Sequence, residues 1–126
     1  MDAAQMKKIL IVDDQPELRE LVRATLEMNN YQIVEAISGE EAIEIAGIER
    51  PDLIIMDVTM PGIINGLEAC KIIRKDSMTR KTKVIMLTGM GQEIGRQASF
   101  EAGADDYFVK PFSPLELLKK IEEVLE

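Results

Sequence analysis

Five charged or hydroxyl side chains come directly after short apolar runs of the sequence. They are Asp13 and Asp14 after "ILIV", Asp57 after "LIIM", Thr88 after "VIML" and Lys110 after "DYFV". Almost continuously apolar runs are typical of buried parallel strands, and ligands of open α/β sheets bind beyond the carboxyl ends of such strands. The spacing therefore predicts that three carboxylates, one hydroxyl and one ammonium group converge on one site.

Three carboxylates in one place repel each other unless a cation neutralises them. A set of oxygen ligands with room for water suits Mg²⁺, and Mn²⁺ is the alternative. Such a metal could hold a phosphoryl group while an acceptor carboxylate acts as the nucleophile, and Lys110 and Thr88 could bind the phosphoryl oxygens. This chemistry forms an aspartyl phosphate and differs from general acid–base catalysis.

Each of these residues also has a simpler structural explanation. Asp14 and Glu17 match a capping-box-like pair at the start of a helix. Asp57 could be an ordinary loop acid, although it abuts a buried run where an unpaired charge is costly. Lys110 could be a solvated lysine at a strand end, and Thr88 could satisfy a local backbone group. The joint pattern favours a functional site over this set of separate explanations.

Composition narrows the class of protein. The 126 residues suffice for one domain, and 46% apolar with 30% charged residues is typical of a globular chain. With 15 basic against 23 acidic residues the net charge is −8, so we expect no direct binding of nucleic acid. The absence of histidine excludes imidazole zinc sites and Ser-His-Asp or Cys-His nucleophile systems.

Two further observations bear on the compartment in which we expect the protein. A single cysteine, Cys70, permits no internal disulfide and favours a reducing environment. The apolar stretch 9–12 is too short for a membrane span, and no signal-peptide pattern precedes it. We therefore expect a cytoplasmic protein without membrane insertion.

Five apolar runs alternate with helical periods along the chain. The predicted strands are 7–12, 31–36, 52–56, 83–87 and 106–109, and the predicted helices are 15–29, one capped by Ser38, 67–75, 92–102, and one capped by Ser113. Five such units in series predict an α/β fold with an open parallel sheet and helices on both faces. The second strand carries no charge at its end, which suggests an edge position. We expect one domain over residues 1–126.

Four segments together resemble the receiver domain of two-component response regulators of the chemotaxis-regulator-like type. They are "ILIVDDQPELRELV", "PDLIIMDVTMPG", "VIMLTG" and "GADDYFVKPFSPLEL", in order and at near-standard spacing. The resemblance covers essentially the whole chain. It implies a flavodoxin-like (βα)5 doubly wound parallel sheet with strand order 2-1-3-4-5.

The resemblance also implies how a metal would be held. Asp57 would be the phosphoacceptor and a metal ligand. Asp14 would position Mg²⁺ directly and Asp13 largely through water. The backbone carbonyl of Thr59 would be a further ligand.

By the same resemblance, Lys110 would pair with the phosphoryl group and Thr88 would turn its hydroxyl toward it. Tyr107 would be an aromatic switch that turns inward as Thr88 moves; a core tyrosine is the alternative. The bond between Lys110 and Pro111 would be a cis peptide.

The implied partners are a sensor histidine kinase or histidine phosphotransfer protein, and a downstream protein target. The chain would be a signalling module that catalyses only its own phosphorylation and dephosphorylation. It would act alone, without a DNA-binding output domain, or be a receiver cut from a longer regulator. Two other classes remain: a metal-dependent phosphohydrolase, which commonly has an acid where Thr59 stands, and a flavodoxin-like electron carrier, whose cofactor phosphate Asp13 and Asp14 would repel.

Two local features depart from the family or vary within it. The segment "IIN" (63–65) before Gly66 is one residue longer than usual, and its isoleucines could pack under the loop or face a partner. Thr59 and Met90 correspond to positions that tune the lifetime of the phosphorylated form. We expect that lifetime to exceed that of rapidly cycling chemotaxis regulators.

Three glycines lie in the stretch "LTGMGQEIG" after the fourth predicted strand. A phosphate-binding dinucleotide loop follows the first strand instead, so this position argues against one. We interpret the stretch as a hinge in which Gly89 leaves the pocket open and Gly91 permits several backbone paths. Gly95 lies inside the predicted helix 92–102, where it costs about 1 kcal/mol relative to alanine. It either eases rearrangement of that helix or allows close packing.

Overall fold

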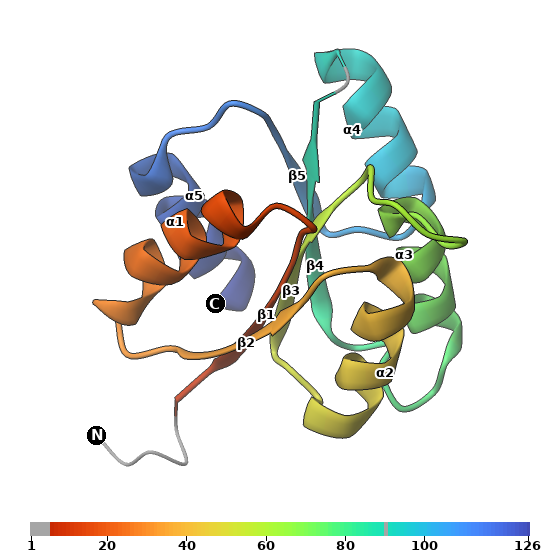
Figure 1. Cartoon of the computed structure of the whole chain (residues 1–126), viewed down its shortest axis with the longest axis horizontal. Coiled ribbons are helices and arrows are strands. Elements are labelled where there is room, and N and C mark those ends of the chain that lie inside the picture. The colour runs from red at the N-terminus through yellow and green to blue at the C-terminus, as the bar shows by residue number, and fades with distance from the viewer. Residues whose placement is uncertain (1–5, 90) are drawn as a thin grey trace.

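The structure is a computed structural model that describes residues 6–89 and 91–126. Strands and helices alternate along these residues (Figure 1). The elements are β1 (Lys8–Val12), α1 (Pro16–Glu27), β2 (Gln32–Ala36), α2 (Gly39–Glu49), β3 (Leu53–Asp57), α3 (Gly66–Lys75), β4 (Lys83–Thr88), α4 (Gln92–Glu101), β5 (Asp106–Val109) and α5 (Pro114–Leu125).

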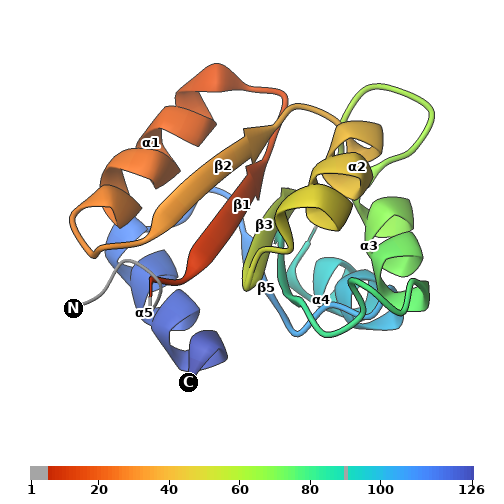
Figure 2. The ribbon, with the colours of Figure 1, turned by 90° about the horizontal axis from the view of Figure 1, so that it is seen from below.

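All neighbouring strands pair in parallel, and their order in the sheet is β2-β1-β3-β4-β5. The flavodoxin-like strand order is therefore confirmed, and β2 lies at an edge as expected. Helices α1 and α5 cover one face, and α2, α3 and α4 cover the other (Figures 1 and 2). Each face has its own apolar core because side chains alternate along a strand. On β4, Met86 packs toward Cys70 and α3, while Leu87 belongs to the cluster with Val22 and Ile121.

The predicted strands and helices agree with the observed ones to within about two residues at each end. Two of the differences fall at strand ends that carry the chemistry. Asp57 and Thr88 are the last residues of β3 and β4 rather than the first residues of the following loops. Both side chains are thus oriented by hydrogen-bonded backbone. At the helix starts, Ser38 accepts the Glu41 N–H at 3.1 Å, and Ser113 caps α5.

The longer loop between β3 and α3 returns tightly to the strand end. The Gly66 N–H donates to the Val58 carbonyl at 3.0 Å, and a Cβ at Gly66 would lie 1.9 Å from the Asp57 carbonyl oxygen. Only glycine fits there. Ile63 is 90% exposed, as expected of a residue that faces a partner. Ile64 is half-buried against the core, as expected of a residue that packs under the loop. The extra length therefore lies in an exposed tip and leaves Asp57 in place.

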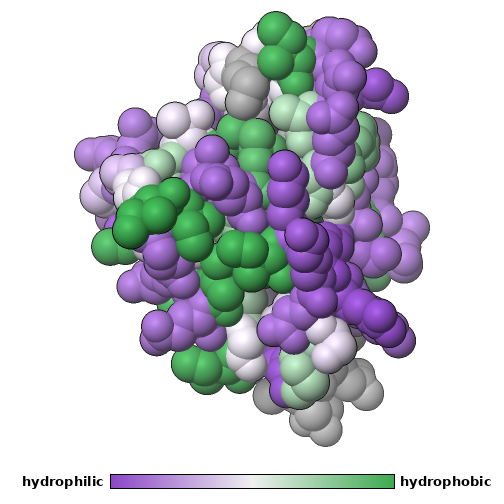
Figure 3. Space-filling model, turned by 90° about the vertical axis from the view of Figure 1, so that its right-hand side faces the viewer, coloured by the Kyte–Doolittle hydropathy of each residue, from purple (hydrophilic) through white to green (hydrophobic). Residues whose placement is uncertain are grey.

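Apolar side chains also reach the surface over the helices. The face with α2, α3 and α4 carries hydrophobic patches separated by hydrophilic side chains (Figure 3). Exposed residues on these helices include Ile48, Ile72, Ile94 and Phe100. In the described part of the chain, no helix combines the length and apolar character needed to cross a membrane.

Candidate functional site

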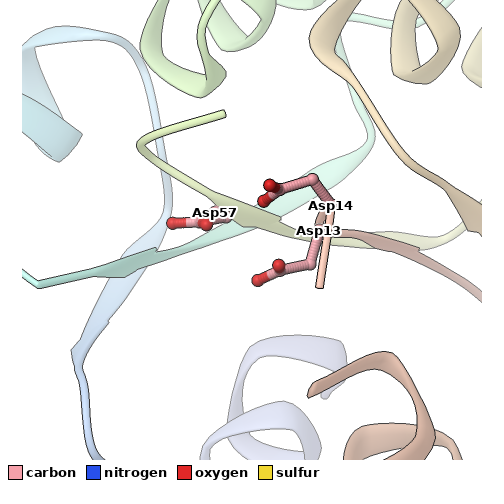
Figure 4. A group of neighbouring side chains, drawn as sticks. All are labelled: Asp13, Asp14 and Asp57. Atoms are coloured by element: carbon pink, nitrogen blue, oxygen red, sulfur yellow. The ribbon is translucent and has the colours of Figure 1, made fainter. Parts of the chain in front are cut away.

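The structure brings the three predicted carboxylates together. Val12 pairs with Met56 across β1 and β3, so the residues that follow them lie side by side at the carboxyl edge of the sheet. Figure 4 shows Asp13, Asp14 and Asp57 at these two strand ends. One carboxylate oxygen from each residue lies within 4.8 Å of the others. The convergence predicted from the spacing is therefore observed.

Lys110 completes the group from the end of β5. Its Nζ lies 3.1 Å from Asp57 Oδ2 and 3.4 Å from Asp13 Oδ2. The other oxygen of each carboxylate accepts a backbone N–H, from Thr59 at 3.2 Å for Asp57 and from Gln15 at 2.9 Å for Asp13. These contacts orient both buried carboxylates, and Lys110 is an ion-pair partner rather than a freely solvated lysine.

The site carries more negative than positive charge. Three carboxylates face one ammonium group, and Asp13 is fully buried while Asp14 is exposed. Burial raises the pKa of Asp13 and the charge of Asp57 raises it further, although the Gln15 hydrogen bond and Lys110 act in the opposite direction. A divalent cation would offset the remaining repulsion. The all-oxygen donor set fits Mg²⁺.

These residues border an open cavity of about 390 Å³. Asp14, Asp57, Thr59, Gly89 and Lys110 are among its lining residues. A Cβ at Gly89 would meet nothing within 4 Å, so the glycine leaves this side of the cavity open. A group the size of a phosphoryl has access to Asp57 from solvent.

The two predicted switch residues lie on the side of the sheet that α4 covers. Thr88 is fully buried and its carbonyl accepts the Lys110 N–H at 2.8 Å, which links the ends of β4 and β5. Tyr107 is half-buried and packs edge-on against Phe100 of α4, with ring centroids 5.9 Å apart. The expected cis peptide between Lys110 and Pro111 is present. Met90 lies outside the described residues.

Asp14 does not cap helix α1, which was the simpler explanation for this residue. The N-cap of α1 is Gln15, no side chain makes the capping hydrogen bond, and Pro16 begins the helix. Asp14 instead lines the cavity.

Sequence reasoning missed one supporting residue, Arg19. Its Nη1 donates to the Asp13 carbonyl at 2.8 Å and its Nε donates to Glu35 at the same distance. Burial opposes ionisation of Glu35, but the ion pairs with Arg23 and Arg19 outweigh it and hold the pKa of Glu35 below its usual value. No local pattern marks Arg19, because Glu35 belongs to a different element.

An open parallel sheet with an acidic, lysine-bearing cavity at its carboxyl edge defines a class of α/β proteins that bind charged ligands at this edge. Comparison with known families identifies which one. The chain matches the response regulator receiver domain over residues 9–122, and it belongs to this family. Receiver domains are signalling modules that generally bind Mg²⁺ at an acidic cluster, and Asp13, Asp14 and Asp57 form such a cluster here.

Individual relatives agree with this assignment. The chain is 47% identical over 126 residues to the transcriptional regulatory protein ResD of Bacillus subtilis, covering 99% of this chain and 50% of ResD. The chemotaxis response regulator CheY4 of Vibrio cholerae superposes with a TM-score of 0.88 at 38% identity, covering 95% of this chain and 99% of that one.

A second similar structure was solved with a metal ion. The receiver domain of the sensor histidine kinase PA1611 from Pseudomonas aeruginosa, described with a magnesium ion in its active-site cleft, gives a TM-score of 0.86 at 29% identity. It covers 95% of this chain and 98% of that one. The chain spans about half the length of the curated relatives it matches.

Proposed function

We propose that the chain is a phosphorylation-driven switch in which Asp57 accepts a phosphoryl group. The observation that carries this proposal is the cluster of Asp13, Asp14 and Asp57 beside Lys110, in which one carboxylate oxygen from each aspartate lies within 4.8 Å of the others. Asp13, Asp14, Asp57 and the carbonyl of Thr59 would hold Mg²⁺. The donor would be a phosphohistidine of a sensor kinase or phosphotransfer protein, or a small phosphodonor.

Each residue of the site would have its own role in the phosphoryl transfer. An oxygen of Asp57 forms a bond to phosphorus while the phosphorus–nitrogen bond of the phosphohistidine breaks and the imidazole leaves. Lys110 moves its ion pair from the carboxylate to the phosphoryl oxygens, where it stabilises the developing charge. The Thr59 N–H, already on Asp57, keeps the nucleophile oriented. A bound divalent cation would neutralise the carboxylates and the phosphoryl charge.

Phosphorylation would then change a surface that binds a partner protein. The added charge would attract the hydroxyl of Thr88, and Tyr107 would turn inward into the space that Thr88 leaves. The affected face would comprise α4, β5 and α5, which together expose Ile94, Phe100 and Leu115. Apolar side chains of this kind are suited to a protein partner.

The proposal has a second form, because the curated relatives are about twice as long as this chain. The chain would then be the receiver of a longer regulator, whose remaining part supplies the output. In both forms residues 1–126 act as one domain, in the cytoplasm where ATP-dependent kinases supply phosphoryl groups.

Incubation with acetyl phosphate or phosphoramidate and Mg²⁺, followed by intact mass measurement, tests the core of the proposal. We expect one phosphoryl adduct in the wild type and none in Asp57→Asn. Asp76→Asn is the matched control, because this exposed residue at the end of α3 lies outside the site. An adduct that persists in Asp57→Asn, or none with several donors in the wild type, would refute it. The decay of the adduct also tests the expected long lifetime, which a half-life of seconds would contradict.

A further inference from the structure

Gly95 of α4 lies directly against the side chain of Thr88. The helix runs back along β4 after the loop, so its first full turn covers the end of that strand (Figure 1). A Cβ at Gly95 would lie 2.7 Å from Cγ2 of Thr88 and 3.1 Å from its Oγ1. Carbon atoms in contact are about 3.5–4.0 Å apart, so an alanine would not fit while Thr88 keeps this position. Of the two earlier explanations for Gly95, close packing is the one observed.

This position holds Thr88 away from the place where its proposed role requires it. Asp57 and Lys110 line the cavity, whereas Thr88 is fully buried and is not among the residues that line it. A hydroxyl that contacts a phosphoryl group on Asp57 has to approach this cavity. The contact between Thr88 and Gly95 therefore belongs to the unphosphorylated arrangement, which we call the resting state.

We propose that Gly95 is a positioning residue whose missing side chain allows the resting position of Thr88. The inference rests on the proposed function, because it concerns the balance between the resting and phosphorylated states. A side chain at position 95 would occupy the resting position of the Thr88 side chain. The protein would then favour the conformation in which Thr88 has moved away from α4. The fraction of molecules ready to accept a phosphoryl group then rises, and the apparent affinity for its mimic rises with it.

A set of five proteins tests this: the wild type, Gly95→Ala, Thr88→Ser, their double variant, and Gly47→Ala. Each is titrated with beryllofluoride, a stable phosphoryl mimic, in Mg²⁺. Overpacking raises the free energy of the resting state, so we expect Gly95→Ala to bind the mimic at least about threefold more tightly than the wild type. Serine lacks Cγ2, the atom nearest to the added methyl group, so the double variant should bind like Thr88→Ser alone. Gly47 is the matched control, because a Cβ there in α2 meets nothing within 4 Å, and its variant should bind like the wild type.

A measurement on the wild type keeps the test independent of whether the variants fold. In the unliganded protein, the Gly95 Hα protons and the Thr88 methyl group should give a strong nuclear Overhauser effect. The effect should weaken or vanish when beryllofluoride and Mg²⁺ are added. A contact that persists at full strength in the loaded protein would overturn the inference.

The remaining outcomes separate this inference from the proposed function. If the wild type is phosphorylated and Gly95→Ala binds the mimic equally or more weakly, Gly95 is a packing residue only and the inference fails alone. If the double variant keeps the gain of Gly95→Ala, the effect does not pass through Thr88 and the inference also fails. If the wild type takes neither mimic nor phosphoryl group, the proposed function fails and Gly95 has no part in it.

Discussion

Replacing Asp13 by asparagine should stabilise the metal-free protein and weaken its stabilisation by Mg²⁺. Asp13 is fully buried within 4.8 Å of two other carboxylates and has one ammonium group at 3.4 Å. At an effective dielectric constant of about 20, each repulsion is worth about 3.5 kcal/mol and the attraction about 5 kcal/mol. The net repulsion is then about 2 kcal/mol. Solvent in the open cavity reduces it, so we expect a gain of about 1–2 kcal/mol.

Mg²⁺ should reverse this advantage. A ligand that binds only the folded state stabilises it by about 2.7 kcal/mol at a concentration 100 times its dissociation constant. The wild type should gain this stabilisation, and Asp13→Asn should gain less because one carboxylate is lost. Urea unfolding with EDTA and with Mg²⁺ measures both effects. The reasoning is refuted if the variant is less stable in EDTA and both proteins respond equally to Mg²⁺.

The pH dependence of the free energy of unfolding independently tests whether ionised Asp13 destabilises the metal-free protein. The pKa of Asp13 is raised in the folded state. The folded protein therefore binds a proton at this residue more tightly than the unfolded chain does. The destabilisation by its ionised form is therefore present at neutral pH. It decreases as pH falls through the raised pKa and is absent below the ordinary value of 3.8. The advantage of Asp13→Asn in EDTA should shrink over the same range, and an advantage that grows on acidification would contradict this cause.

Two other predictions concern buried groups outside the cavity. Ser99 is fully buried in α4 and its hydroxyl has no hydrogen-bond partner among residues 6–89 and 91–126, so Ser99→Ala should raise the free energy of unfolding by about 1 kcal/mol in urea titrations. A loss of stability would show that the hydroxyl is satisfied in solution. Burial raises the pKa of the Cys70 thiol to about 11, so the native protein should not react with a disulfide reagent at neutral pH but should react in urea. Rapid labelling of the native protein would contradict this.

The strand ends show how much of the site could be predicted from the sequence. Buried parallel strands are continuously apolar, and their carboxyl ends share one edge, so Asp13, Asp57 and Lys110 could be placed together from their positions after such runs. The start of α2 at Ser38 could also be predicted from a short stretch of sequence, because a capping side chain forms its hydrogen bond within its own helical turn. The capping box of Asn65 and Glu68 at α3 is just as local but was not predicted.

Only the tertiary structure decided the contacts between elements that are distant in sequence. Lys110 bridges two carboxylates because β5 ends next to β4, which itself pairs with β3. Arg19 pairs with Glu35 because α1 packs over β2. The glycine at position 95 had two explanations until the packing of α4 on β4 placed it against Thr88. Local sequence determines which residues stand at the ends of strands and helices. Distances between those ends depend on how the helices pack on the sheet, and no single segment encodes that packing.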